Sequence, residues 1–278
     1  MRSTIVIFVL GFAVLGLLLG FSESFDTQPE NAVNAAVADV EIRIDTFVSA
    51  MQATSELQQV RSTDYVDSIS TAQMGIPENE DVEKREVARQ VISEHPEFAS
   101  IFFLTPSGDI YIGEPFEQQE QLPRLNYADR DWYKGASTTN DAYVSSVFMS
   151  AAIHVPAIAI AVPVYADPEG RIAGYGVAIV DVSNIDSSLR QIGGESRILL
   201  VDHNGTQIAD TGMPLQETTE LRPFANLQSV KSALSGEAGT IVQEVDGVEM
   251  VASFAPVNAH PHTWAIVFLQ PAEDAAPQ

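Results

Sequence analysis

The hydrophobic pattern of this chain begins with an uncharged apolar run at residues 4–21. As a helix that rises 1.5 Å per residue, this run would extend about 27 Å, close to the ~30 Å hydrocarbon core of a bilayer. Arg2 precedes the run and Glu23 and Asp26 follow it. The positive-inside rule therefore predicts a short cytoplasmic segment at residues 1–3 and a membrane anchor, with the bulk of the chain outside the cytoplasm. A cleaved signal peptide is the alternative, although the run is longer than a usual signal core.

A second pattern, with a helical period, follows the apolar run and predicts a stalk helix within residues 22–62. Apolar residues recur there at alternating spacings of three and four, which places them on one seam of a helix. The residues of this seam are Val33, Val37, Val40, Ile44, Phe47 and Met51. The seam either packs against a following part of the same chain or pairs with a second copy to form a homodimer. The sequence leaves both alternatives open.

Shorter helical patterns occur further along the chain. One predicted helix covers residues 64–74, and another covers residues 81–94 and ends before Pro96, because the residue before a proline disfavours helical geometry. A further amphipathic helix is predicted at residues 227–234, ended by Gly236.

A third pattern, of strand, polar turn and strand, occurs twice. Residues 100–113 and residues 196–210 both show it, and each copy is followed by a longer strand hairpin, at residues 157–183 and residues 248–271 respectively. Gly108 and Gly205 are 97 positions apart, and Pro163 and Pro256 are 93 apart. We interpret this as a tandem repeat of two α+β units.

The predicted fold class is therefore α+β, with a long N-terminal helix followed by two tandem modules built on antiparallel sheets. We expect a membrane-distal module at residues 63–191, a membrane-proximal module at residues 192–272 and a short tail at residues 273–278.

Charge and composition exclude several classes of function. The chain has 14 Lys and Arg against 38 Asp and Glu, a formal net charge of −24, so it would repel nucleic acid and anionic lipid headgroups. It has no cysteine, which excludes disulfides and thiolate metal sites. His260 and His262 flank Pro261 in a predicted hairpin turn and are not expected to bind a metal.

Taken together, the anchor, the long helix and the two modules resemble the double Cache sensors of prokaryotic chemoreceptors and sensor kinases, which have two PAS-like modules. The resemblance covers residues 30–271. It is strongest in LNYADRDWYKGA, DAYVSSVF and IAVPVYADPEGRIAGYGVAIVDVSNI, at residues 125–136, 141–148 and 160–185.

The resemblance implies a ligand site in the first of the two modules. Members of that family bind a small ligand with an Arg, a Trp and an aromatic of an R-x-W-Y stretch, and with an Asp at the end of a later strand. The matching residues here are Arg130, Trp132, Tyr133 and Asp181. An arginine for a carboxylate, an aspartate for an ammonium and aromatic walls suit a small zwitterion such as an amino acid.

The sequence departs from the family at one position of this site. Amino-acid-binding members usually carry a further tyrosine five positions before the arginine, where this chain has Leu125, whereas Tyr127 lies three positions before it. Tyr127 and, in a predicted strand, Tyr143 are therefore further candidates for the site. An amino acid, a carboxylate, an amine and a nucleobase-like ligand all remain open.

Structural roles compete with ligand binding at these positions. The aromatic residues would also suit a core, Arg130 could pair with Asp129 or Asp131, and Asp181 could cap a helix that begins near Ser183.

No motif of nucleophilic, metal-dependent or phosphate-binding catalysis is present, so we predict neither enzymatic activity nor a cofactor. The predicted function is that of an extracytoplasmic small-molecule sensor in the cell membrane. The alternative is an anchored protein that captures solutes or partners without signalling.

Overall fold

The computed structural model describes residues 29–213 and 220–272, and it contains one long helix and two antiparallel sheets. The predicted anchor at residues 4–21 and the tail at residues 273–278 lie outside these residues. Among the described residues, no helix combines the length and the apolar character that a membrane crossing requires.

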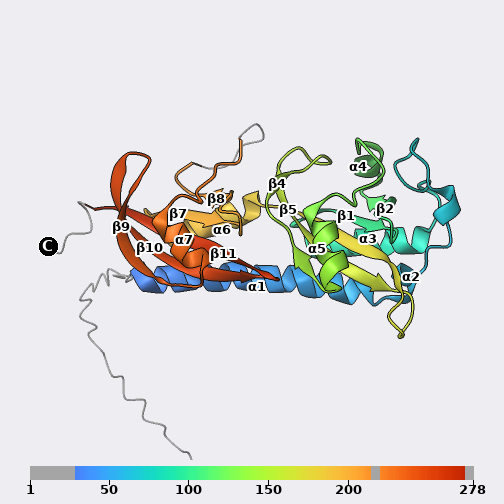
Figure 1. Ribbon diagram of the computed structural model, residues 1–278. Helices are drawn as coiled ribbons and strands as arrows, with labels where there is room; N and C mark the ends of the chain where they lie inside the picture. Colours follow the sequence, from blue (N-terminus) through green and yellow to red (C-terminus); the bar gives the residue numbers. More distant parts are fainter. Residues whose placement is uncertain (1–28, 214–219, 273–278) are drawn as a thin grey trace, which may run out of the picture.

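Helix α1 (Pro29–Ser55) runs beside both sheets (Figure 1). The predicted seam is buried, with Val40, Ile44 and Met51 fully inaccessible to solvent, and it packs against strands of the same chain. The alternative in which the seam contacts its own chain is therefore present; pairing with a second copy remains a prediction. A short helix, α2 (Gln58–Arg61), follows α1.

The first sheet has the strand order β2-β1-β6-β5-β3, with β4 also paired to β5. Its strands are β1 (Phe98–Leu104), β2 (Ile110–Glu114), β3 (Tyr143–Val144), β4 (Phe148–Met149), β5 (Pro156–Tyr165) and β6 (Ile172–Asp181). Helices α3 (Val82–Glu94), α4 (Phe116–Glu120) and α5 (Asp131–Thr139) belong to the same unit, which we call the first module. Strands β5 and β6 are buried along almost their whole length, because apolar clusters cover both faces of this sheet.

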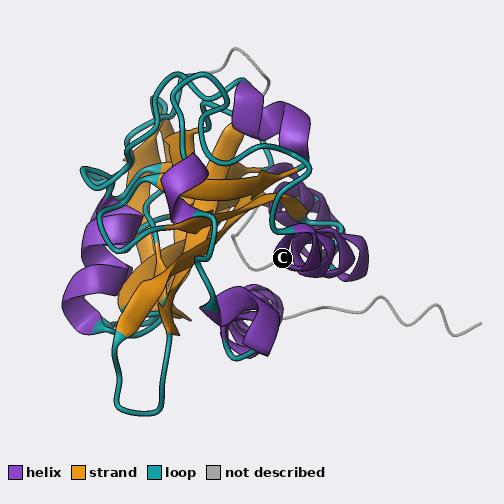
Figure 2. Ribbon diagram, turned by 90° about the vertical axis from the view of Figure 1, so that its right-hand side faces the viewer, coloured by secondary structure: helices purple, strands orange, loops and turns teal. Residues whose placement is uncertain are grey.

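The second sheet has the strand order β8-β7-β11-β10-β9. Its strands are β7 (Arg197–Val201), β8 (Gln207–Asp210), β9 (Gly239–Val245), β10 (Val248–Ala259) and β11 (His262–Pro271). With helix α7 (Gln228–Leu234) they form the second module, and α6 (Ser183–Gly193) connects the two modules. Figure 2 shows helices on both sides of the strands.

The two modules repeat the same local geometry at the predicted offset. Phe102 faces Gly113 across β1 and β2, and Leu199 faces Asp210 across β7 and β8, each pair being 97 positions from its counterpart. The strand irregularity after Phe103 in the first module recurs after Leu200 in the second. The tandem repeat and the α+β class are therefore confirmed, whereas the module boundaries remain predictions. The proposed limit between residues 191 and 192 falls inside α6.

One predicted helix is wrong. Residues 64–74 form a loop with a short 3-10 turn, η1 (Val66–Ser68), instead of a helix. This segment lacks a buried apolar face, since Tyr65 and Val66 are exposed, and its backbone bonds elsewhere. The Tyr65 amide donates to the Tyr111 hydroxyl at 3.3 Å, and Ser70 pairs with Gly75. Helix α3, in contrast, ends at Glu94, two residues before Pro96, as expected.

Candidate functional site

A cavity lies on the face of the first sheet that is turned away from α1. Its walls come from β1, β2, β4 and β6, from α5 and the segment before it, and from the loop after β4. The lining residues are Phe102, Ile110, Leu122, Tyr127, Arg130, Trp132, Phe148, Ser150, Ala151, Ala152, Val177 and Ile179. The cavity volume is about 40 Å³. One water molecule needs roughly 10–15 Å³ on this scale, so the cavity in this form accepts a ligand of only a few heavy atoms.

A glycine turn positions the segment that carries the arginine. Gly108, at φ +87°, turns the chain between β1 and β2, and its carbonyl accepts a hydrogen bond of 2.8 Å from the Tyr127 amide. The Ile110 amide donates to the Leu125 carbonyl at 2.9 Å. Together these bonds hold the loop before α5 across the end of β2 and fix Tyr127 at the cavity.

Helix α5 then places its apolar residues towards the sheet. Arg130 is the N-cap residue with extended backbone, and Trp132 and Ala136, one helical turn apart, are the buried residues of the helix. The Trp132 ring stacks on the Tyr127 ring with 6.3 Å between centroids. The R-x-W-Y stretch is therefore a helix start that aims its tryptophan into the first module.

Arg130 has no charged partner among the residues that the structure describes. Its guanidinium group makes no ion pair or hydrogen bond there and lies 5.9 Å from the ring centroids of Tyr127 and Phe148. The two neighbouring carboxylates are engaged elsewhere. Asp129 pairs with Arg124 at 2.6 Å, and Asp131 accepts hydrogen bonds from the Ser146 amide and hydroxyl, both at 3.0 Å. The competing role, in which Arg130 holds one of these carboxylates, does not occur here.

The Tyr127 hydroxyl is the second notable polar group at this cavity. The residue is 6% exposed, and the hydroxyl has no hydrogen-bond partner within the described part of the chain. Burial raises the pKa of this hydroxyl, whereas the nearby guanidinium groups of Arg124 and Arg130 act in the opposite direction. The group is therefore a neutral donor, and an unpaired buried donor normally indicates a missing partner.

The other three candidate residues lie outside the cavity lining. Tyr133 donates from its hydroxyl to the Pro106 carbonyl at 2.6 Å and packs edge-on against Tyr175. Asp181 ends β6, and its carboxylate accepts a hydrogen bond of 2.9 Å from the Ser183 amide at the start of α6. The N-cap residue of α6 is Val182, so Asp181 bonds to the first helical amide from one position before the cap. Asp181 follows Ile179 by two residues, on the same face of the strand but beyond the cavity.

Tyr143 points instead to the junction between the modules. Its hydroxyl lies 2.8 Å from His262 Nε2, and the His262 ring stacks on His203 at 3.7 Å between centroids. Burial, followed by the charge of His203, lowers the pKa of His262. The Val147 amide donates to Asp202 Oδ2 at 3.0 Å in the same region, so the segment before β4 is bonded to the second module.

Sequence reasoning missed Phe148 and Ser150, which close the cavity. The Ser150 hydroxyl is buried and accepts long hydrogen bonds from the amides of Ala152 and Ile153, at 3.3 and 3.4 Å. Phe148 is the last residue of DAYVSSVF, one of the stretches that carry the family resemblance, and Ser150 lies two positions after it. Residues two positions apart in a strand face the same side, so the spacing of Phe148 and Ser150 could have predicted that both face the cavity.

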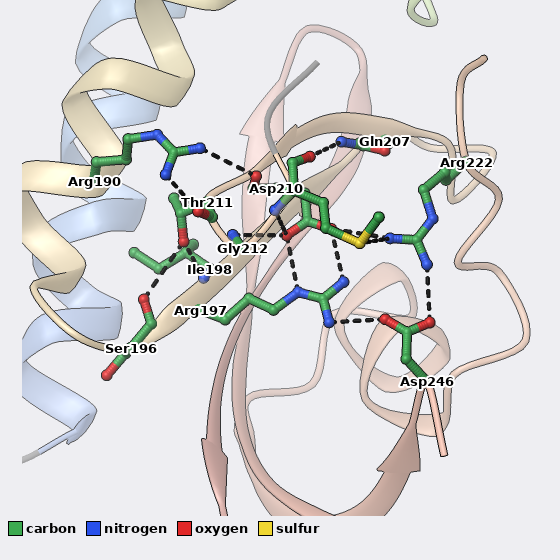
Figure 3. A network of polar contacts seen from close by, with 11 residues as sticks. Arg190, Ser196, Arg197, Ile198, Gln207, Asp210, Thr211, Gly212, Arg222 and Asp246 are labelled. Carbon is green, nitrogen blue, oxygen red and sulfur yellow. Dashed lines mark hydrogen bonds and ion pairs between the residues drawn. The ribbon is translucent and has the colours of Figure 1, made fainter. Parts of the chain in front are cut away.

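The corresponding part of the second module holds a network of ion pairs (Figure 3). Asp210 is fully buried and accepts hydrogen bonds from Arg197 Nε and Nη2 at 2.8 and 2.7 Å. Arg222 lies 3.3 Å from the same carboxylate, and Asp246 bonds to both arginines at 2.8 Å. The arginines lower the pKa of Asp246, which keeps it ionised. Both arginines are thus paired within the module, unlike Arg130.

At the 97-residue offset, Arg130 corresponds to Leu227 and Trp132 to Ser229. The backbone bonds around them are the same, since the Leu227 amide donates to the Phe224 carbonyl as the Arg130 amide donates to the Tyr127 carbonyl, both at 3.0 Å. The modules therefore share these backbone hydrogen bonds but carry side chains of different chemical type at the corresponding positions.

Solved structures with the same fold include ligand-binding domains of chemoreceptors. The domain of the Pseudomonas aeruginosa amino acid chemoreceptor PctB, solved with L-Gln, is 14% identical with a TM-score of 0.64, and the alignment covers 88% of this chain and 90% of that one. The domain of the Pseudomonas fluorescens chemoreceptor CtaA, solved with L-alanine, is 12% identical with a TM-score of 0.61, covering 89% and 97%. At these identities the likeness concerns the fold.

Sequence comparison extends this result. Sporulation kinase D of Bacillus subtilis is 23% identical over 133 residues, which is 48% of this chain but only 25% of the kinase. The family model described as Cache domain, in its double form, matches residues 21–276, nearly the whole chain. The chain therefore belongs to the double Cache domain family, as the resemblance predicted.

Proposed function

We propose that this chain is the extracytoplasmic sensor of a transmembrane signalling protein and that it binds a small ligand, an amino acid or a related acid, in the first-module cavity. The observation that carries the proposal is Arg130, a cation without a charged partner among the described residues, at the wall of a mostly apolar cavity. A partly desolvated guanidinium group is unfavourable unless an anion joins it. A ligand carboxylate would supply that anion in bidentate form.

The orientation of the helices supports a membrane-distal position for this cavity. Helix α1 begins beside the second module and reaches the first module with its later turns (Figure 1). The chain leaves the second sheet after β11, also at that end. If residues 4–21 anchor the chain, the second module lies next to the membrane and the first module points away from it.

Contacts between the modules offer a route for a signal. Ligand contact with Phe148 or Ser150 would move the segment that begins at Val147, whose amide is bonded to Asp202 of the second module. Helix α1 is bonded to the same junction, since Asp45 lies 2.7 Å from His260 Nε2 and Glu41 accepts from the Asn258 amide at 2.8 Å. A change at the cavity would thereby reach the helix that leads to the predicted anchor.

The proposal is tested by ligand screening of the purified chain by thermal shift, with amino acids, amines and small carboxylates, followed by calorimetric titration of each hit. Replacing Arg130→Gln removes a charge-assisted contact worth about 2–4 kcal/mol, so affinity should fall roughly 30- to 1000-fold. Arg171→Gln is the matched control, because Arg171 is 73% exposed on the β5–β6 turn and its ion pair within the described residues is with Asp167. Equal affinity in both variants would refute the assigned site.

The membrane topology has its own test. Protease added to intact cells that produce the full chain should cleave the described region while leaving a cytoplasmic marker intact. Recovery of a soluble form that starts shortly after residue 21 would replace the anchor by a signal peptide.

A further inference from the structure

The polar side-chain groups of the residues that line the first-module cavity can all donate a hydrogen bond to a ligand. They are the Arg130 guanidinium, the Tyr127 hydroxyl and the Ser150 hydroxyl. The Ser150 oxygen already accepts two backbone amides, so its own proton is free to be donated, and the Tyr127 hydroxyl has no partner among the described residues. Three donors on the lining of one cavity, one of them cationic, suit the two oxygens of a carboxylate.

No acidic side chain lines the cavity among the described residues. Asp181, the residue expected to bind an ammonium, accepts a hydrogen bond from the Ser183 amide and lies two residues beyond Ile179, which is about 7 Å along the strand. Asp129 and Asp131 are engaged by Arg124 and Ser146. An ammonium group in the cavity would therefore lose its water without gaining a carboxylate, and it would share the space with the Arg130 cation.

The remaining walls are apolar. The apolar lining residues are Phe102, Ile110, Leu122, Trp132, Phe148, Ala151, Ala152, Val177 and Ile179. Such walls favour a ligand whose body is hydrocarbon, and a cavity volume of about 40 Å³ suits a short chain.

From this arrangement we infer that the cavity selects a short-chain monocarboxylate that has no amino group, in preference to the corresponding α-amino acid. The inference rests on the proposed function, since it names the ligand class of the same cavity. It also separates this chain from chemoreceptor domains that were solved with amino acids, because an ammonium has no partner on these walls.

Two pairs of probes that differ only by the amino group test the inference directly: propionate against L-alanine, and butyrate against L-2-aminobutyrate. Titration of the full chain, purified in detergent, should show at least about tenfold tighter binding of each acid than of its amino acid. Propionamide, which has the shape of propionate without its charge, should bind far more weakly than propionate.

Variants then locate the selectivity. Arg130→Gln should weaken propionate binding roughly 30- to 1000-fold, Tyr127→Phe should weaken it by about threefold to tenfold through loss of one neutral hydrogen bond, and Asp181→Asn should leave it unchanged. Ser150→Asp adds the carboxylate that the cavity lacks, so it should weaken propionate binding and narrow or reverse the preference over L-alanine. Trp132 fluorescence in a Trp264→Phe background follows occupancy, since these are the two tryptophans of the chain and only Trp132 lines the cavity.

The outcomes separate the inference from the proposed function. If L-alanine binds as tightly as propionate, in a manner that depends on Arg130 and Asp181, the inference is overturned and the cavity remains a sensor site. If no amino acid, amine or carboxylate binds, both are overturned. A propionate affinity that Arg130→Gln leaves unchanged would also overturn the inference.

Discussion

The two modules share a backbone arrangement but differ in whether the arginines on it have a charged partner. The second module satisfies Arg197 and Arg222 internally with Asp210 and Asp246, whereas the first module has Ser100, Gly113 and Leu125 at the positions of Arg197, Asp210 and Arg222. The first module instead carries Arg130 beside a cavity, where the second module has Leu227 packed against its core. Arg197 and Arg222 are neutralised within their own module and need no ligand. Arg130, which has no charged partner among the described residues, can bind an external anion.

The largest expected effect concerns the paired module. Asp210→Asn leaves two arginines without their shared buried carboxylate and should lower the free energy of unfolding by about 3 kcal/mol. Urea denaturation followed by Trp264 fluorescence in a Trp132→Phe background reports on the second module. Asp246→Asn is the control with the same arginines, and because Asp246 is 44% exposed it should cost no more than about 1 kcal/mol. Equal losses in the two variants would contradict the role of burial.

A second prediction tests the shared frame. Gly108 and Gly205 have φ of +87° and +75°, and a Cβ at either would lie under 3.0 Å from the following segment, at Ala128 and Ala225 respectively. Gly108→Ala and Gly205→Ala should each cost about 2 kcal/mol in urea denaturation. Gly170 also has a positive φ, of +88°, but no atom would lie within 4 Å of an added Cβ. Gly170→Ala should therefore lower the free energy of unfolding by only about 1 kcal/mol. A harmless substitution at one of the paired glycines would break the equivalence of the turns.

A third prediction tests whether the cavity wall must be apolar, by giving the first module a residue of the second. Ile110 lines it, and the corresponding residue of the second module is Gln207. Ile110→Gln should lower stability by about 1–2 kcal/mol, because the amide has no assigned partner there, and should weaken ligand binding. Ile110→Val, which removes one methylene and keeps the wall apolar, should cost about 1 kcal/mol and preserve binding. Calorimetric titration and urea denaturation measure the two effects, and a stable, binding-competent glutamine variant would argue against an apolar wall.

The smallest effect is expected at the junction between the modules. The pKa of His262 is lowered in the folded protein, so the unfolded chain takes up the proton first as the pH falls. The contribution of His262 is therefore fully present above its unfolded pKa of about 6.5 and is lost as the pH falls below that value. His203 stacks on His262, Tyr143 bonds to it, and the carboxylates of Asp131 and Asp202 oppose the shift.

Thermal unfolding between pH 8 and pH 5 measures this effect. His203→Gln removes the like charge and should reduce the loss of stability at acid pH, whereas His154→Asn, at an exposed histidine, should not. An unchanged pH profile in His203→Gln would mean that the histidine pair does not govern the acid response of the junction.

Local patterns in the sequence were enough to predict the long helix, the two hairpin pairs and the tandem repeat. Each depends on periodicity or turn chemistry, as in the seam from Val33 to Met51 and the glycines at positions 108 and 205. Family resemblance located Arg130 and Trp132 at what is now the cavity wall. The predicted helix at residues 64–74 failed because the backbone of that segment bonds to Tyr111 of a strand far along the chain.

Only the tertiary structure decided which candidate residues share a cavity. Tyr127, Arg130 and Trp132 meet Phe148 and Ser150 because β4 folds back beside the start of α5, a contact between segments that no local pattern encodes. Tyr143 and Asp181, in contrast, are directed to the module junction and to the start of α6. Sequence determines the period, the turn and the residue type, but the partner of each charge depends on which distant strand the fold brings beside it. For that reason Arg130, without a described partner, could be distinguished from Arg197 and Arg222 only in three dimensions.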